Sequence, residues 1–266
     1  MENTKVTPMT LRQMKEKGDK NTLIPVYDYP FARILDECGV DVLLVGDSLG
    51  KQILGRKEYL SVTVDEMIHH TQAVVRAAER AMVVTDLPFM SYEVNIDEAK
   101  RNAGRIIKEG GADAVKLEGG IEVVETIAAL VKAGIPVMGH IGPVSQFAHP
   151  DTPPIRGTTK EDKEVVLRAA KAIEEAGAFM IGLVVVSPDV AAEISRMLKI
   201  PTNGFGSGSN CDGSSQFLYE MIGLNSGPFT PFAKQYANVR QVVIDATKQC
   251  IKEIKGGLFP ASEQGV

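Results

Sequence analysis

Short apolar runs alternate along the chain with longer segments in which apolar residues recur every three or four positions. The bulk and β-branching of most of these runs are typical of parallel strands buried on both sides. Seven runs have this character: residues 22–28, 41–47, 81–86, 113–119, 135–142, 179–186 and 200–208. The pattern therefore predicts seven buried strands.

The segments between the runs have the period of amphipathic helices. Helices are expected over residues 30–38, 64–79, 95–110, 121–133, 161–176, 188–199 and 213–222, with a last one near 236–256. Thr63, followed by Glu66 three residues on, is a capping-box signature at the start of one of them. A further helix is expected in the N-terminal segment, ahead of the first strand.

Alternating strands and helices with short links predict a parallel sheet in an α/β fold. Seven units, with a weaker eighth strand near residues 223–229, fit a (β/α)8 TIM barrel, and 266 residues suit one such domain. An open doubly wound sheet is the alternative, but it usually has a Gly-rich loop after its first strand, and "YDYPFARIL" at that place contains no glycine. No internal boundary is visible, so a single domain over residues 1–266 is predicted.

Charge and cysteine content narrow the possible functions. The net charge is −5 and no block of five Lys or Arg occurs, which argues against binding to nucleic acid or to a membrane surface. The longest apolar stretches, such as "MIGLVVV", are too short for a membrane span, and the polar N-terminus lacks the apolar core of a signal peptide. Cys38, Cys211 and Cys250 have no metal-like spacing and are expected to be free thiols of a cytoplasmic protein.

Acidic residues end three successive predicted strands. Asp47 follows "VLLVG", Asp86 ends "MVVTD" and Glu118 ends "AVKLE". In a parallel barrel the carboxyl ends of the strands meet at the face that carries active sites. Three carboxylates held together would repel one another unless a cation joined them, and hard oxygen ligands suit Mg²⁺. The sequence therefore predicts a Mg²⁺ site for a small anion such as a 2-oxo acid. The alternative is that each acid caps the next helix or closes a turn.

Other polar residues are expected on the same face. Lys116 alternates with Glu118, so both side chains should point to one side, where the lysine could neutralise the acids or hold a carboxylate. Ser48 could donate a hydrogen bond to a bound oxygen, and Tyr27 ends the first strand. His140 ends the fifth strand, where a structural role and a substrate contact are both open. The remaining histidines, His69, His70 and His149, are expected to be structural or solvated.

Several segments resemble those of the ketopantoate hydroxymethyltransferase family, also called 3-methyl-2-oxobutanoate hydroxymethyltransferase. They are "YDYPFARILDECGVDVLLVGDSLG", "SVTVDEMIHHTQAV", "TDLPFMSY", "AVKLEGG" and "PVMGHIGPVSQ". The similarity is dense from about residue 20 to 146 and weaker beyond. It implies a TIM barrel of the phosphoenolpyruvate mutase and isocitrate lyase group, Mg²⁺, and a large cytoplasmic homo-oligomer.

The resemblance also implies a reaction. The family deprotonates 3-methyl-2-oxobutanoate beside its ketone and adds a one-carbon unit from 5,10-methylenetetrahydrofolate. The product, 2-dehydropantoate, leads to pantothenate. By motif, Asp47 and Asp86 resemble the metal ligands, which also contact substrate, and Glu118 resembles a further acid at the metal.

The same motifs imply the substrate contacts. Ser48 and Lys116 resemble the residues that contact the carboxylate and the keto oxygen of the substrate. Lys116, Glu118 and His140 are the expected catalytic residues.

The sequence departs from the family in three places. The general-base glutamate that the family carries after its sixth strand has its counterpart near Val184, and valine cannot accept a proton. The loop within 147–160 differs from the family's Gly-rich segment and borders the region where a lid would act. The third place is "GFGSGSNCDG", where Ser207 and Ser209 add hydroxyls that could change anion contacts, while "CDG" at 211–213 is retained.

Three functions are compatible with these observations. The first is the hydroxymethyltransferase with another base, such as a metal-bound hydroxide, Glu58 or Lys116. The second is a paralogue that uses the same 2-oxo-acid site for a lyase, retro-aldol or decarboxylase reaction, which makes the enolate without removing a C–H proton. The third is a non-catalytic binding protein, against which the three retained acids argue.

Overall fold

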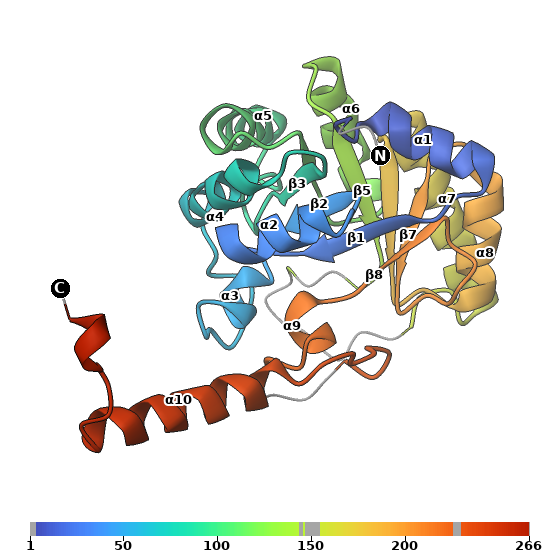
Figure 1. Cartoon of the computed structure of the whole chain (residues 1–266). Coiled ribbons are helices and arrows are strands. Elements are labelled where there is room, and N and C mark those ends of the chain that lie inside the picture. The colour runs from blue at the N-terminus through green and yellow to red at the C-terminus, as the bar shows by residue number, and fades with distance from the viewer. Residues whose placement is uncertain (1–3, 144–145, 147–154, 226–229, 266) are drawn as a thin grey trace. The chain divides into compact units, whose positions relative to one another are not determined.

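A closed barrel of eight parallel strands forms the centre of the computed structural model, which describes residues 4–143, 146, 155–225 and 230–265. Each strand pairs with the next along the chain, and the last pairs with the first (Figure 1). The strands are β1 (Asn21–Pro25), β2 (Val42–Val45), β3 (Met82–Asp86), β4 (Ala114–Lys116), β5 (Val137–Ile141), β6 (Met180–Val184), β7 (Thr202–Phe205) and β8 (Gly213–Ser215). The predicted TIM barrel is confirmed.

Helices connect most of these strands and lie outside them (Figure 1). They are α1 (Pro8–Lys17), α2 (Tyr29–Glu37), α3 (Leu49–Gln52), α4 (Val64–Ala77), α5 (Ile96–Arg105), α6 (Val124–Lys132), α7 (Lys160–Glu175) and α8 (Pro188–Met197). A π-helical turn, Ile106–Gly110, extends α5, and a 3-10 turn, Ile121–Val123, precedes α6. The Thr63–Glu66 capping box is present at the start of α4, as the sequence predicts.

The end of the barrel differs from the sequence prediction. Residues 213–215, expected to begin a helix, form β8, and the eighth strand is therefore not at 223–229, of which 226–229 lie outside the described residues. Gly213 pairs with Asn21 so closely that an added Cβ would lie 2.1 Å from Asn21 Oδ1. Closing the barrel here requires glycine and small residues, and such a strand has no apolar bulk to reveal it in the sequence.

Two apolar layers hold the barrel together. The inner layer fills the barrel and includes Leu23, Val42, Met82, Met138 and Met180. The larger outer layer packs the other faces of the strands against the helices. Because side chains alternate along a strand, the inner residues fix which later positions of each strand face inward.

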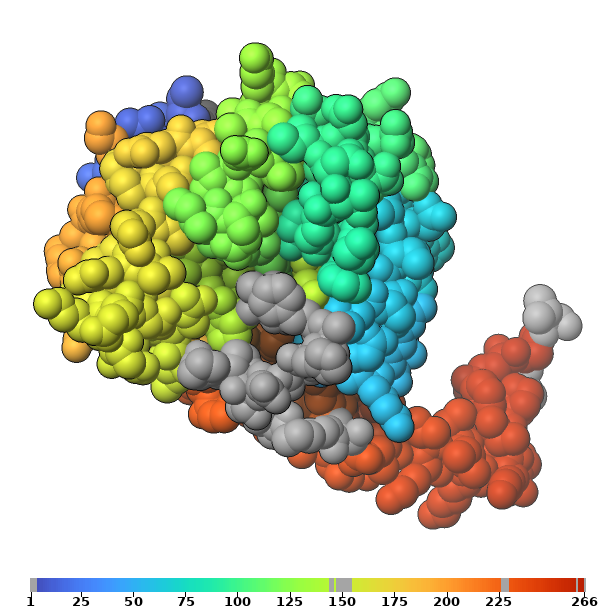
Figure 2. Space-filling model, turned by 180° about the vertical axis from the view of Figure 1, so that it is seen from behind, coloured from blue at the N-terminus to red at the C-terminus, as the bar shows by residue number. Residues whose placement is uncertain are grey.

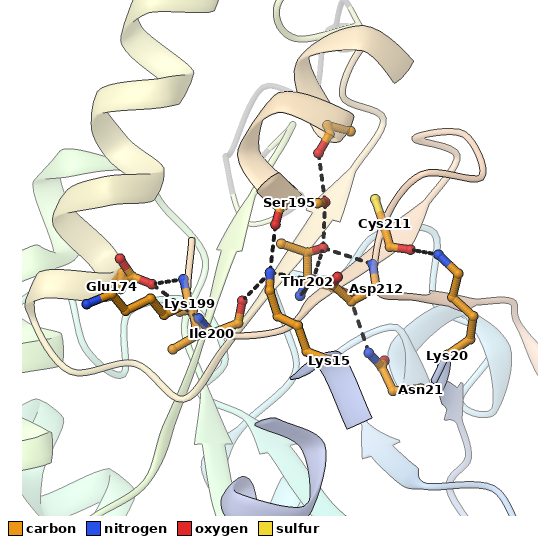
Figure 3. A network of polar contacts seen from close by, with 11 residues as sticks. Lys15, Lys20, Asn21, Glu174, Ser195, Lys199, Ile200, Thr202, Cys211 and Asp212 are labelled. Carbon is orange, nitrogen blue, oxygen red and sulfur yellow. Dashed lines mark hydrogen bonds and ion pairs between the residues drawn. The ribbon is translucent and has the colours of Figure 1, made fainter. Parts of the chain in front are cut away.

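Helix α1 is attached to the barrel through Lys15. Its Nζ donates to the carbonyl oxygens of Ser195 and Ile200 and lies 2.8 Å from Asp212 Oδ2 (Figure 3). Asp212 also accepts from the backbone N–H and the hydroxyl of Thr202. The aspartate of the "CDG" element therefore lies at the start of β8 and joins α1, α8 and β7, away from the carboxyl ends of the strands.

The chain divides into a unit of residues 1–216 and a unit of residues 217–266. In the second unit, α9 (Leu218–Met221) is followed by α10 (Val239–Lys255) and a 3-10 turn, Ser262–Gln264. The Glu220 carboxylate accepts from Thr230, and the Tyr236 N–H donates to the Met221 carbonyl. The expectation of a single domain over the whole chain stays a prediction.

Two further expectations concern membrane-spanning helices and the state of the cysteines. Among the described helices, none combines the length and the apolar character that crossing a bilayer requires. Cys38, Cys211 and Cys250 are free thiols, as predicted, and Cys211 is buried.

Candidate active site

Three buried carboxylates meet at the carboxyl ends of neighbouring strands. Asp47 follows β2, Asp86 is the last residue of β3, and Glu118 lies two residues beyond β4. One oxygen of each lies within 4.8 Å of one oxygen of each of the others. The structure thus brings together the three acids that the sequence singles out, which we call the acid cluster.

A glycine makes room for the acid cluster. An added Cβ on Gly46 would lie 2.9 Å from Ser48 Oγ and 3.3 Å from Asp86 Oδ2. The backbone N–H of Asp47 is 3.2 Å from Asp86 Oδ2. The glycine of "GDS" therefore allows the end of β2 to approach the Asp86 carboxylate closely.

Lys116 supplies positive charge within the acid cluster. Its Nζ is 2.8 Å from Asp86 Oδ1 and 3.2 Å from Glu118 Oε1, and the side chain is buried. Burial alone would lower the pKa of Lys116, but the neighbouring Asp86, Glu118 and Asp47 raise it above its usual value. The lysine is therefore a cation in this environment.

The single positive charge of Lys116 does not balance the negative charges of three carboxylates. Burial, followed by the charges of Glu118 and Asp86, raises the pKa of Asp47 to about 8. Burial likewise raises the pKa of Asp86, although Lys116 opposes the shift. These shifts show that the cluster is short of positive charge, and a divalent cation with oxygen ligands would supply it. The residues present therefore fit Mg²⁺.

Two polar side chains orient the acids. Gln146 Nε2 donates to Asp47 Oδ2 at 2.9 Å and to the Leu87 carbonyl at 3.1 Å. The Tyr92 hydroxyl lies 2.6 Å from Gln146 Oε1 and 2.9 Å from the Glu118 carbonyl oxygen. Neither residue was predicted from the sequence, because both lie in loops where no periodicity indicates the direction of a side chain.

Ser48 and His140 complete the polar side of the site. Ser48 Oγ is 2.8 Å from the hydroxyl of Tyr27, which follows β1. His140 is 4% exposed on β5, and its Nδ1 is 3.2 Å from Glu118 Oε1 without hydrogen-bond geometry. Among the described residues His140 Nε2 has no partner. The structure therefore places all six predicted site residues at one end of the barrel.

Other polar residues of the barrel unit have local roles. Asp28 caps α2 by accepting from the Phe31 N–H. His70 Nδ1 is 2.7 Å from the Tyr27 carbonyl, which agrees with the predicted structural role, and His149 lies outside the described residues. Glu58 accepts from the hydroxyl and N–H of Ser61, and this hydroxyl lowers the pKa of Glu58. A low pKa makes Glu58 a weak base.

The opposite side of the barrel end is apolar. Met180 belongs to the inner layer, so alternation along β6 directs Gly182 and Val184 inward as well. Val184 pairs with Phe205 of β7, and both side chains are partly exposed. The loop that follows β7 contains Ser207, whose hydroxyl donates to the Leu183 carbonyl and accepts from the Val186 N–H.

Two hollows are lined by residues outside the acid cluster. A groove of about 510 Å³ runs between residues 60–65 and 88–105, whose sky-blue and teal segments lie side by side in Figure 2. A smaller hollow of about 120 Å³ lies among residues 119–122, Gly142, Arg156 and α7. Arg156 is already paired there with Asp162 at 2.7 Å.

Comparison with known sequences places the chain among transferases. Residues 5–262 match the model of a family described as ketopantoate hydroxymethyltransferase. The 3-methyl-2-oxobutanoate hydroxymethyltransferase of Syntrophus aciditrophicus (strain SB) is 47% identical over 261 residues, covering 96% of this chain and 94% of the relative. The enzyme of that name from Enterococcus faecalis (strain ATCC 700802 / V583) is 46% identical over 263 residues, covering 98% and 95%.

Solved structures share the fold at low sequence identity. A 2,3-dimethylmalate lyase, described as a PEP mutase/isocitrate lyase superfamily member, has a TM-score of 0.61 at 16% identity, covering 98% of this chain and 89% of that one. Phosphoenolpyruvate phosphomutase from Streptomyces platensis subsp. rosaceus has a TM-score of 0.62 at 16% identity, covering 97% and 91%. These similarities confirm the predicted barrel fold.

Proposed function

Because the chain belongs to the ketopantoate hydroxymethyltransferase family, we propose that it transfers a one-carbon unit from 5,10-methylenetetrahydrofolate to 3-methyl-2-oxobutanoate, giving 2-dehydropantoate. The observation that carries this proposal is the acid cluster. Three buried carboxylates around one lysine suit a divalent cation together with an anionic substrate that has oxygen donors.

Asp47, Asp86 and Glu118 would hold Mg²⁺. The ion would act as a Lewis acid toward the carboxylate and keto oxygens of a 2-oxo acid. Gln146 and Tyr92 support this role because they fix Asp47 and the Glu118 backbone through hydrogen bonds. Oriented ligands bind a metal more tightly than mobile ones.

The remaining polar residues bind the substrate. Ser48, fixed by Tyr27, donates to the substrate carboxylate. Lys116, held as a cation by its acidic neighbours, donates to the keto oxygen, where negative charge develops as the C3 proton leaves.

His140 accepts the C3 proton at Nε2. The other side chains considered as bases are less suited: Lys116 is a cation, Glu58 is bound to Ser61, and Val184 has no basic atom. The His140 side chain is buried beside Glu118, and its Nε2 has no partner among the described residues. The enolate carbon then bonds to the methylene carbon of the folate, and water supplies the hydroxyl oxygen. Both carbon–nitrogen bonds of the methylene carbon break, and tetrahydrofolate leaves with the C3 proton and one proton of the water on its two nitrogens.

Isotope exchange tests this function before folate is involved. The protein is incubated with Mg²⁺ and 3-methyl-2-oxobutanoate in D₂O, and loss of the C3 proton is followed by NMR. We expect exchange that requires Mg²⁺ and is lost in Asp47→Ala. His140→Gln should lower the exchange rate by about 10²-fold or more while Mg²⁺ still raises the melting temperature.

An exposed acid provides the matched control. Asp189→Asn, at the start of α8, removes a carboxylate outside the acid cluster and should leave exchange unchanged. Absence of exchange in the wild-type protein, with the 2-oxo acid still bound, would contradict the proposed reaction.

Self-association is also proposed, from the family resemblance. Helix α10 supports it, because large apolar side chains on this helix are exposed, among them Val243, Ile251 and Ile254. Exposed apolar side chains that follow one side of a helix are typical of a surface that packs against another chain.

A further inference from the structure

The inward positions at the carboxyl ends of the strands form two chemically different sides. Strands β2 to β5 end in the acid cluster, Lys116 and His140. Strands β6 and β7 end in Val184 and Phe205, which pair with each other. In an eight-stranded barrel β6 and β7 lie across from β2 and β3. A ligand held by the acids therefore faces an apolar surface on the other side.

The Val184 side of the barrel is close to the polar side. Gly142 follows β5 two residues after His140, and an added Cβ on Gly142 would lie 3.0 Å from Val184 Cβ. The same added Cβ would lie 2.2 Å from the Val184 carbonyl oxygen. This close approach fixes the end of β6 against β5, so Val184 stands beside the inward face that carries His140.

Hydrogen bonds fix the backbone around Val184. The Ser207 hydroxyl bridges the Leu183 carbonyl at 2.8 Å and the Val186 N–H at 3.0 Å, and Ser207 is 1% exposed. The Val185 N–H donates to Phe205, and the Val185 carbonyl accepts from the Arg156 N–H.

Val185 has a φ of 49°, a left-handed conformation that costs energy for a β-branched residue. The hydrogen bonds of Ser207 and Arg156 hold it in place. The direction of the Val184 side chain is thus set by the surrounding backbone.

We propose that Val184 and Phe205 contact the carbon chain of the substrate, and that Val184 determines the length of chain that the site accepts. This inference rests on the proposed function, because it takes the substrate to be a 2-oxo acid whose oxygens are bound at the acid cluster. With the oxygens held there, the carbon chain extends toward β6 and β7.

The apolar surface around the carbon chain of the substrate determines which 2-oxo acids bind well. An apolar chain gains free energy when Val184 and Phe205 remove it from water. A second carboxylate would lose its hydration against the same two side chains. The two side chains therefore suit the short apolar chain of the proposed substrate, and 2-oxo dicarboxylic acids bind poorly.

Ser207 is a positioning residue in this scheme. It touches no substrate, but its hydroxyl holds the backbone on both sides of Val184. Without this bridge Val184 can move aside, and the site should discriminate less sharply between chain lengths.

The test compares dissociation constants by calorimetry, in the presence of Mg²⁺, for 3-methyl-2-oxobutanoate, 4-methyl-2-oxopentanoate and 2-oxoglutarate. The wild-type protein should bind the first most tightly and the last most weakly. In Val184→Ala the ratio of the first two dissociation constants should change by about tenfold or more in favour of binding the longer acid, 4-methyl-2-oxopentanoate. A pocket discriminates one methylene by that order. Val184→Leu should shift the ratio the other way, and Ser207→Ala should bring it closer to one.

Val165→Ala is the matched control, because this valine is exposed on α7 and lies outside the barrel interior. It should leave the ratio unchanged. An unchanged ratio in Val184→Ala and Val184→Leu, with tight binding retained, would overturn this inference and leave the proposed function standing. If the wild-type protein with Mg²⁺ bound no 2-oxo acid, this inference and the proposed function would both be refuted.

Discussion

At the scale of single residues, the site is defined by charge that its surroundings do not balance. Asp47, Asp86 and Glu118 are buried together, and Lys116 neutralises only part of their charge. Gln146 stabilises the charged form of Asp47 but does not reverse the effect of burial. The metal-free site is therefore less favourable at high pH than the site with a cation.

The pH dependence of stability tests this imbalance. The folded-state pKa of Asp47 is raised to about 8, so the folded chain binds this proton more tightly than the unfolded chain, in which the pKa is about 4. Its contribution to stability is complete below about pH 4 and is lost as the pH rises toward 8. In EDTA, the melting temperature should fall over this range, and the fall should be smaller in Asp47→Asn, which cannot titrate.

Added Mg²⁺ provides the control for that experiment. By binding the folded state, it should raise the melting temperature most at high pH, where the carboxylates are charged, and should do so much less in Asp47→Asn. Equal pH dependence in the wild-type and Asp47→Asn proteins would refute the assignment of this titration to Asp47.

At the scale of elements, single side chains connect segments that are far apart in sequence. Lys15 of α1 binds two carbonyl oxygens near the end of α8 and the Asp212 carboxylate before β8. Ser207, in the loop after β7, contacts the end of β6 by donating a hydrogen bond to the Leu183 carbonyl. Such contacts hold strand ends in place, and strand ends carry the site.

Loss of the Lys15 contacts should destabilise the barrel. Lys15→Met would leave two carbonyls and Asp212 without their charged donor, and we expect the free energy of unfolding to fall by about 2–3 kcal/mol. Chemical denaturation measures the change. Arg12→Ala on the same helix removes only an exposed pair with Glu16 and should cost less than about 0.5 kcal/mol. Similar effects of the two substitutions would contradict the structural role of Lys15.

At the scale of the whole molecule, the barrel unit of residues 1–216 and the unit of residues 217–266 differ in how they bury apolar surface. The first has two apolar layers. In the second, α10 has no buried residue. A 17-residue amphipathic helix without a buried face gains little from folding alone, so a partner surface would stabilise it.

Disruption of that apolar surface should lower the assembled mass. Ile251→Glu places a charge among the exposed apolar residues of α10, and multi-angle light scattering should show a smaller particle than the wild type. Gln249→Glu adds the same charge at a polar position of this helix and should leave the mass unchanged. A wild-type protein that is monomeric at micromolar concentration would contradict the proposed self-association.

Much of the fold and part of the site follow from the sequence. Seven strands and eight of the nine expected helices lie where the sequence predicts them, because burial on one or both faces imposes a periodicity locally. Asp47, Asp86 and Glu118 could be singled out because acids at strand ends are conspicuous, and parallel strands end at one face.

Only the tertiary structure decided the rest. β8 has no apolar signature, and closure of the barrel against Asn21 determines that Gly213 to Ser215 form a strand. Gln146 and Tyr92 reach the acids from loops, where no local pattern fixes the direction of a side chain. The inward direction of Val184 depends on its register with Phe205 and on Ser207. Strand register and loop position arise from contacts between distant segments, so they can be read only when those segments are placed together.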